Sequence, residues 1–301
     1  MNGTQVDAAG LVETAERKRV LVALAGIHAK RYVRHPVFLV TAALVLLSVP
    51  RAIVSPDADN GAEWDSTLMF VLWIGLFGVV VGYRLAVTEE KALDLLPSAP
   101  TDQRVRTLAL FAACLVPVVA TVVLMGCYGV ANLLVWQSAD APFLLRPDTG
   151  QIGWIDYIAS VLEAPVSAFG GAALGIVVAR WLRFAGAGVL AMVVVFLVEI
   201  LCLAIGETSL VGDKLWARAL ANLMPYRYWF YNPDGAEGTY YSTMAPGSAV
   251  GHVIYATALC GLAITAGVLK GATPAVKTAC MKVGGALMAV AVAAYLWALL
   301  G

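Results

Sequence analysis

Two carboxylic acids, Glu163 and Glu199, lie within long apolar runs. An ionised group at bilayer depth costs roughly 3 kcal/mol or more, so it usually faces a bundle interior or a water-filled cavity. Glu199 lies deeper in its run, and we expect it to be a polar contact on a transport path, with a hydrogen-bonded packing role as the alternative. Glu163 is near the outer end of its run, close to Pro165, and we expect it to reach the interface.

The other residues with catalytic potential form no motif. A lone histidine is more often a hydrogen-bonded structural residue than a catalyst, and we expect this of His28, His35 and His252. The five cysteines lie in or beside the apolar runs, show no CxxC spacing and are expected to be buried small apolar residues. The sequence contains no GxxxxGK[ST] phosphate loop, no HExxH and no GxSxG. We therefore expect no enzyme active site, no metal site and no cofactor bound by this chain itself.

A charged segment with the sequence TEEKALDLLPSAPTDQRVR, residues 88–106, separates two apolar runs. We expect Thr88 to cap a short amphipathic helix with Glu89 and Glu90 in its first turn. Leu93 and Leu96 are three residues apart and would share one face of that helix. A membrane protein that builds such a surface helix on a tight loop is expected to present it to a partner.

The end of this segment carries stop and start signals for helices. Pro97 and Pro100 would end the short helix, and Thr101 with Asp102 would begin the next one. The segment therefore predicts a helix, a turn and a second helix.

The composition is that of a polytopic membrane protein: 60% of residues are hydrophobic, 13% are charged, and the mean hydropathy is +0.81. A bilayer-spanning helix needs about 20 mostly apolar residues. We therefore predict an all-α membrane protein with six or seven transmembrane helices. The candidate spans are roughly 37–54, 66–87, 107–135, 157–179, 185–206, 250–269 and 283–300.

Positive charge is distributed asymmetrically between the loops. With the N-terminus in the cytoplasm, fifteen of the twenty Lys and Arg residues fall in cytoplasmic segments. The positive-inside rule therefore favours this orientation and places the 88–106 loop in the cytoplasm.

The N-terminal region has two parts. Residues 1–16 are polar and expected to be loosely ordered, and residues 17–35 are expected to form a basic amphipathic helix in the membrane interface, with Pro36 opening the first span. A signal peptide is the alternative, because a basic stretch precedes VLVALAGI. That apolar run is short, and HAKRYVRHP is a poor cleavage context.

The remainder, 17–301, is expected to be one transmembrane domain with a long external loop at 207–249. Its aromatic residues fit either a belt at the membrane boundary or short re-entrant helices. Small residues recur four apart, and we expect them to pack helices within one chain rather than form a dimer seam. These pairs are Gly78/Gly82, Gly171/Gly175 and Gly285/Ala289.

Two segments resemble a known family. YVRHPVFL, residues 32–39, follows the basic helix and opens the first span, and EEKALDLLP, residues 89–97, is followed by RVRTLA at 104–109. Together they resemble the entry segment and the first cytoplasmic loop of permease subunits of type 2 ABC transporters, especially actinobacterial ones. The likeness in sequence covers about 32–110, and the likeness in layout covers most of the chain.

The resemblance implies an elbow helix carrying Arg31, Arg34 and His35. It also implies a coupling helix that docks in a groove of a separate ATP-binding subunit. The implied contact residues of the coupling helix are Thr88, Glu89, Glu90, Leu93, Asp94 and Leu96. Members of the family commonly have six spans, so a seventh would place the C-terminus outside.

The function that this resemblance implies is that of the permease subunit of an ATP-driven exporter in the plasma membrane, a multi-pass protein acting as a homodimer. The partner subunit would bind ATP and Mg²⁺, and the chain itself would contact lipids and no nucleic acid. The alternative is a proton-coupled secondary transporter that uses Glu199. Broken helices and inverted repeats would support this alternative.

Overall fold

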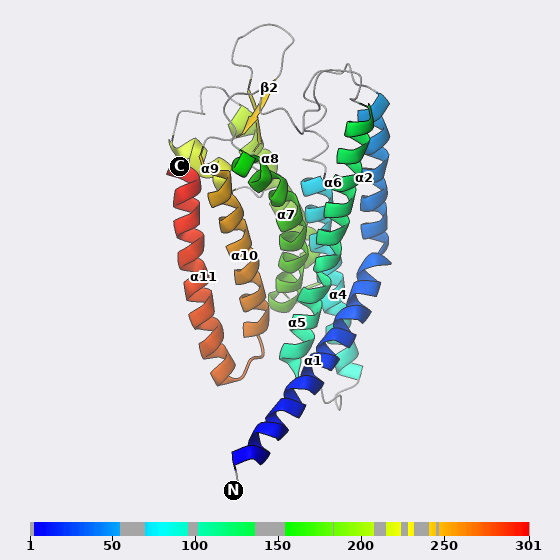
Figure 1. The fold of residues 1–301 in the computed structure, drawn as a ribbon, viewed down its shortest axis with the longest axis vertical. Helices are drawn as coiled ribbons and strands as arrows, with labels where there is room; N and C mark the ends of the chain where they lie inside the picture. Colours follow the sequence, from blue (N-terminus) through cyan, green and yellow to red (C-terminus); the bar gives the residue numbers. More distant parts are fainter. Residues whose placement is uncertain are drawn as a thin grey trace.

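The structure, a computed structural model, describes the backbone of residues 3–54, 70–95, 102–135, 154–182, 184–207, 215–223, 228–231, 241–244 and 247–300. In this part of the chain the protein is a bundle of helices, with the N- and C-termini at opposite ends (Figure 1). Its helical elements are α1 (Gly3–Val33), α2 (Pro36–Val54), the π-helical turn η1 (Phe70–Gly75), α4 (Leu76–Leu95), α5 (Gln103–Ala113), α6 (Leu115–Val135), α7 (Trp154–Trp181), α8 (Ala187–Glu207), α9 (Leu215–Leu223), α10 (Ala249–Leu269) and α11 (Pro274–Leu300).

The length and apolarity of the helices confirm the prediction of a helical membrane protein. Within the described residues, four helical stretches are long and apolar enough to cross a membrane: Gln103–Cys127, Val161–Trp181, Ala249–Leu269 and Pro274–Leu300. Two shorter apolar helices cover Pro36–Leu47 and Ala187–Cys202. The expected total of six or seven spans requires two or all three of α2, α4 and α8 to contribute as well.

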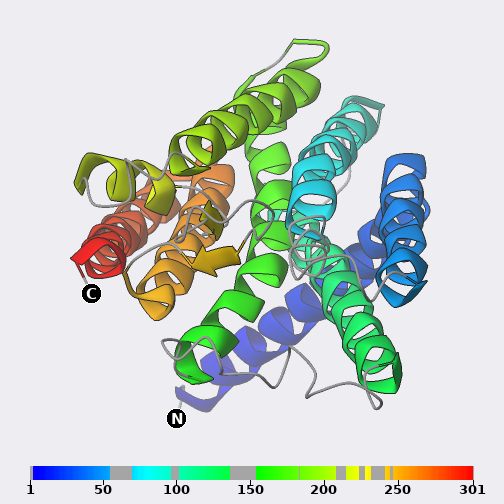
Figure 2. The ribbon, with the colours of Figure 1, turned by 90° about the horizontal axis from the view of Figure 1, so that it is seen from above.

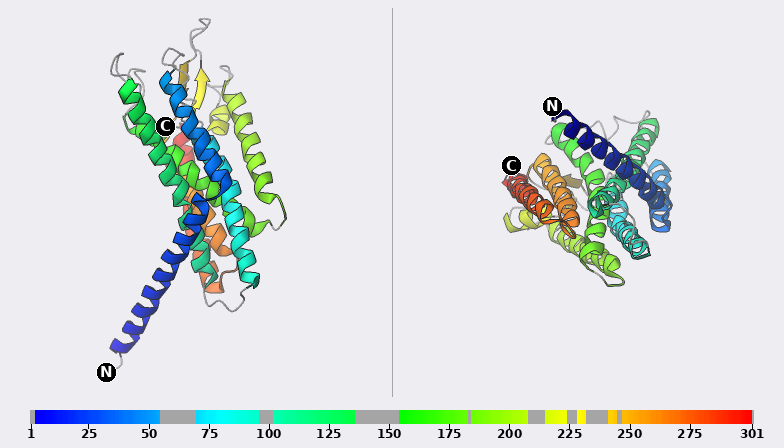
Figure 3. Two further views of the ribbon diagram at one scale, coloured as in Figure 1. Left: turned by 90° about the vertical axis from the view of Figure 1, so that its right-hand side faces the viewer. Right: turned by 90° about the horizontal axis from the view of Figure 1, so that it is seen from below.

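The N-terminal helix α1 is longer than expected. It begins at Gly3, inside the segment predicted to be loosely ordered, and its first half extends away from the bundle (Figure 3). It ends in a tight turn in which the amide of His35 donates to the carbonyl of Tyr32 at 3.0 Å. Pro36 is the first residue of α2, as predicted, because its fixed φ and missing N–H suit a helix start.

Helix α7 packs closely against both η1 and α4, and glycines make this possible. A Cβ atom on Gly171 would overlap the carbonyl oxygen of Gly75, and one on Gly175 would overlap that of Val79. Gly82 faces the carbonyl oxygen of Ala172 in the same way. The predicted packing role of the first two small-residue pairs within one chain is confirmed.

The third small-residue pair behaves differently. A Cβ atom at Gly285 on α11 would meet no atom within 4 Å in the described chain, so this glycine makes no comparable close contact. The packing within one chain that was expected for Gly285/Ala289 is therefore not found in the described part of the protein, where Ala289 is exposed as well.

The predicted span 107–135 is divided into α5 and α6. Pro117 lacks the N–H that would bond the carbonyl of Ala113, and its ring crowds that carbonyl. The chain therefore tightens just before the proline, where the amide of Cys114 donates to Phe111 at 3.0 Å.

A short β-hairpin lies at the end of the bundle away from the N-terminus (Figure 1). Strands β1 (Tyr228–Tyr231) and β2 (Tyr241–Met244) form an antiparallel hairpin with Tyr231 opposite Tyr241. The fold remains a helical one, and this short hairpin is a local addition to it that the sequence did not predict. Aromatic and β-branched side chains favour strands when they are not held in a span. The hairpin lies within the predicted external loop, as does α9.

Candidate functional site

The charged segment after the second predicted span is not a separate helix. Residues 88–95 are the last turns of α4, and the hydroxyl of Thr88 donates to the carbonyl of Arg84 at 2.8 Å, one turn back in the same helix. Thr88 is therefore not an N-cap. No helix-breaking residue lies between Val87 and Leu95, so the helix of the span continues into the charged segment.

The predicted start of the following helix is correct. The carboxylate of Asp102 accepts from the amide of Arg104 at 3.1 Å and caps α5. This side chain bonds one of the amides that have no partner within the helix.

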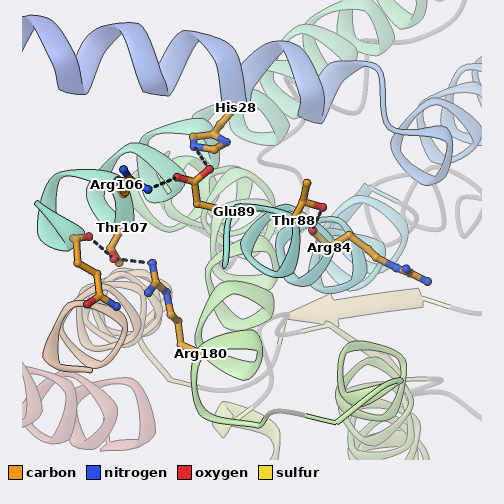
Figure 4. A network of polar contacts seen from close by, with 8 residues as sticks. His28, Arg84, Thr88, Glu89, Arg106, Thr107 and Arg180 are labelled. Carbon is orange, nitrogen blue, oxygen red and sulfur yellow. Dashed lines mark hydrogen bonds and ion pairs between the residues drawn. The ribbon is translucent and has the colours of Figure 1, made fainter. Parts of the chain in front are cut away.

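Glu89 points into the protein rather than toward a partner. It is 7% exposed, and its carboxylate lies 3.7 Å from Nη1 of Arg106 on α5 and 3.6 Å from Nε2 of His28 on α1 (Figure 4). This corrects the expected contact role of Glu89, because its charge is already matched inside the chain.

Glu90 and a buried arginine form a second contact of α4. Nη1 of Arg180, at the end of α7, lies 3.8 Å from the Glu90 carboxylate, and its Nη2 donates to the hydroxyl of Thr107 at 2.8 Å. The Thr107 hydroxyl in turn donates to the carbonyl of Gln103 at 2.9 Å. Arg180 is only 1% exposed, whereas the side chain of Glu90 is one-third exposed.

We call these six residues the polar network: His28, Glu89, Glu90, Arg106, Thr107 and Arg180. It contains two carboxylates and two guanidinium groups, so its charges balance when His28 is neutral. Burying such charges costs several kcal/mol per ion, and the attraction between the paired charges offsets this cost. Removing one member of a pair would leave the other charge buried without that compensation. The network therefore holds the end of α4 to α1, α5 and α7 at one place (Figure 4).

The histidine of the polar network is uncharged at neutral pH. Burial lowers the pKa of His28 below 6.5, although Glu89 acts in the opposite direction, and Arg31 lowers it further. The 3.6 Å contact between His28 and Glu89 is therefore an ion pair only after acidification.

Stability is expected to fall as the pH decreases below about 6.5, the pKa of an unfolded histidine. There the unfolded chain binds a proton on His28 that the folded protein takes up only at lower pH. The thermal unfolding midpoint in detergent, measured from pH 7.5 to 5, should depend less on pH in His28→Gln. His35→Gln is the matched comparison. Burial and Arg84 also lower the pKa of His35, so the pH dependence of the midpoint should decrease in this variant as well. An unchanged slope in both variants would contradict this expectation.

The other predicted residues of the elbow and the coupling segment are more dispersed. Arg31 and Arg34 are exposed on α1, and His35 is half-buried in the turn after it. Thr88 is exposed. Leu96 lies outside the described residues, as do the side chains of Leu93 and Asp94.

A second buried pair lies between α7 and α10. Nδ1 of His252 is 2.8 Å from Oε1 of Glu163, and both side chains are fully buried. The prediction that Glu163 reaches the interface is therefore wrong, because its side chain is buried against His252. The structural role expected for His252 is confirmed, because Glu163 is its hydrogen-bond partner.

Glu199 lies at a cavity of about 260 Å³ between η1, α4, α7, α8 and α10. Its Oε2 atom is buried and has no hydrogen-bond partner among the described residues. The structure does not bring Glu199 together with the polar network: Glu199 lies on α8 beside this cavity, whereas the network joins the end of α4 to α1, α5 and α7.

Sequence reasoning missed the polar network because its members come from four helices. One signal in the sequence could have indicated the network: Glu89 and Glu90 are adjacent, so they lie about 100° apart on a helix and are directed to different neighbours.

Comparisons with protein-family models, curated proteins and solved structures found no match for this chain.

Proposed function

We propose that this chain is the membrane permease subunit of an ATP-driven exporter, moved by ATP hydrolysis in a separate subunit. The observation that carries the proposal is the ionic attachment of the end of α4. This end continues as a charged helix, and Glu89 and Glu90 tie it to α1, α5 and α7.

The polar network supports a mechanical form of coupling. A partner that pushes on the segment between α4 and α5 would displace both helices together, because Glu89 and Arg106 pair across them. Arg180 would carry the same displacement to α7 through Glu90 and Thr107. The coupling residues thus act inside the chain, and the outer surface of this segment is left for the partner.

Among the described residues expected to contact a partner, Glu89 is buried, whereas others are accessible. Thr88 and Lys91 are exposed near the end of α4, and Glu90 is partly exposed. In this proposal the segment faces the cytoplasm and docks in a groove of the ATP-binding subunit. That subunit supplies ATP and Mg²⁺, and a second permease copy completes a homodimer in the plasma membrane.

The first step of the experiment is to determine whether a neighbouring gene encodes an ATPase with a GxxxxGK[ST] loop. Such an ATPase is then co-expressed and co-purified with this chain. Lys91→Glu should weaken assembly about three- to fivefold, which corresponds to a rim charge worth ~0.7–1 kcal/mol. The matched control is Lys277→Glu, an exposed lysine in the first turn of α11, which begins at the same end of the bundle (Figure 1).

Equal assembly and equal ATPase stimulation in wild type and Lys91→Glu would contradict the proposed docking surface. Transport that continues without ATPase and stops when the proton gradient is collapsed would contradict the proposed energy source. That result would favour a proton-coupled transporter instead.

A further inference from the structure

The cavity beside Glu199 has an unusual combination of an apolar wall and one acidic side chain. It is lined by small and branched residues of η1, α7, α8 and α10, among them Gly75, Gly170, Val195 and Leu259. In Figure 2, α7 (green) runs through the middle of the bundle, and α10 (orange) lies on the side of α7 that faces away from α2 (blue). The polar atoms of the lining belong mainly to Ser167, Tyr255, Cys260 and Glu199.

No positive side chain balances the carboxylate within this cavity. The described lining residues include no Lys, Arg or His. Oε2 of Glu199 is buried without a hydrogen-bond partner in the described part of the chain. An acidic group in such surroundings usually pairs with a cation or marks a substrate path.

We propose that this cavity binds a compact lipophilic monocation, whose positive group pairs with Glu199 while its apolar body fills the space between α7, α8 and α10. This inference rests on the proposed function and names the substrate class of the same transporter. Two features of the site favour this occupant over a neutral one: the unpaired carboxylate and the ring of Tyr255, whose face can attract a cation.

The size of the cavity restricts the ligand further. Its volume of about 260 Å³ is below the roughly 300 Å³ at which sites for drug-sized ligands begin. A small ammonium ion with one aromatic ring satisfies this limit, and Tyr255 is itself held by a ring contact of 5.4 Å to Tyr295. The site therefore selects by charge and by compactness.

The test measures binding to the full chain in nanodiscs of neutral phosphatidylcholine, without an ATPase. Benzyltrimethylammonium is the charged probe, and neopentylbenzene is its uncharged isostere. We expect calorimetry to show saturable binding of the cation and much weaker binding of the isostere. Glu199→Gln should bind the cation about ten- to a hundredfold more weakly, the usual effect of losing a contact between charged groups.

A second variant tests the cavity independently of the charge. Ala256→Leu, on the α10 wall, should weaken binding by reducing the volume while Glu199 is retained. The thermal unfolding midpoint of each variant shows whether it is folded. Cation binding that is unchanged in Glu199→Gln would overturn the proposal, and so would equal binding of the two probes to the wild type. Because no ATPase takes part, these results do not depend on whether the chain assembles with one.

Discussion

Replacing Gly171 with alanine is expected to lower the free energy of unfolding by about 3 kcal/mol or more. A Cβ atom at this position would overlap the carbonyl oxygen of Gly75, and backbone cannot move aside as a side chain can. Overpacking commonly costs about 1–3 kcal/mol, and here the obstacle is the helix backbone itself. The measurement is the thermal unfolding midpoint of the protein in detergent, together with the fraction that elutes as a single species.

The control for this substitution is Gly126→Ala on α6, where a Cβ atom would meet nothing within 4 Å. Alanine has the higher helix propensity, so Gly126→Ala should leave stability unchanged or raise it by up to ~1 kcal/mol. Equal unfolding midpoints for Gly171→Ala and Gly126→Ala would show that α4 and α7 are not in contact at this seam.

In the proposed mechanism, this seam also links the polar network to the cavity. Gly75 and Gly171 line the cavity that contains Glu199, and α4 and α7 also carry Glu89, Glu90 and Arg180 of the polar network. Helices in backbone contact move as one unit. A displacement at the charged end of α4 would therefore be transmitted along α7 to the cavity.

Replacing His252 with alanine is the second substitution with a large expected effect. It leaves the carboxyl group of Glu163 without its described partner in a fully buried site, where the Oε2 atom already has none. Breaking a buried pair by removing one member costs about 3–5 kcal/mol. Thermal unfolding in detergent should show a correspondingly lower midpoint.

The double variant Glu163→Gln/His252→Ala separates charge from packing. If the loss comes from an isolated carboxylate, glutamine at 163 should recover part of the stability, because it carries no charge. His35→Ala serves as the histidine control, since His35 is half-buried and no side-chain ion pair of this residue is described; its cost should stay below about 1 kcal/mol. A double variant no more stable than His252→Ala would contradict a charge-based effect.

Local signals in the sequence predicted several elements correctly. Pro36 begins α2, and Asp102 caps α5, because both residues act on backbone within one turn of themselves. The glycine pairs of α4 and α7 were also identified, since a spacing of four places small residues on one helix face. The helix start and the cap depend only on neighbours in the chain. Which small-residue pair packs depends on the fold as well, since Gly285 has the same spacing and makes no close contact in the described chain.

Other predictions failed where a helix met something distant in sequence. Thr88 looked like a helix cap, yet α4 passes through it, because a cap signal cannot end a helix that has no breaker beside it. Glu163 looked like an interfacial residue, but His252, far along the chain, lies beside it. The predicted burial of the cysteines is also only partly correct. Cys114 and Cys202 are buried, whereas Cys127 is exposed on α6.

Composition and local pattern thus determined that this is a helical membrane protein with a charged segment between two apolar helices. They act through hydrophobicity and short-range backbone chemistry, which any stretch of the chain carries by itself. Only the tertiary structure decided that Glu89 faces inward to Arg106 and His28. It also decided that Glu199 lies beside a cavity whose described lining residues include no cationic side chain. The physical reason is that pairing and burial depend on which helices pack together, and the charges of one helix are matched or left unmatched by residues far away in sequence.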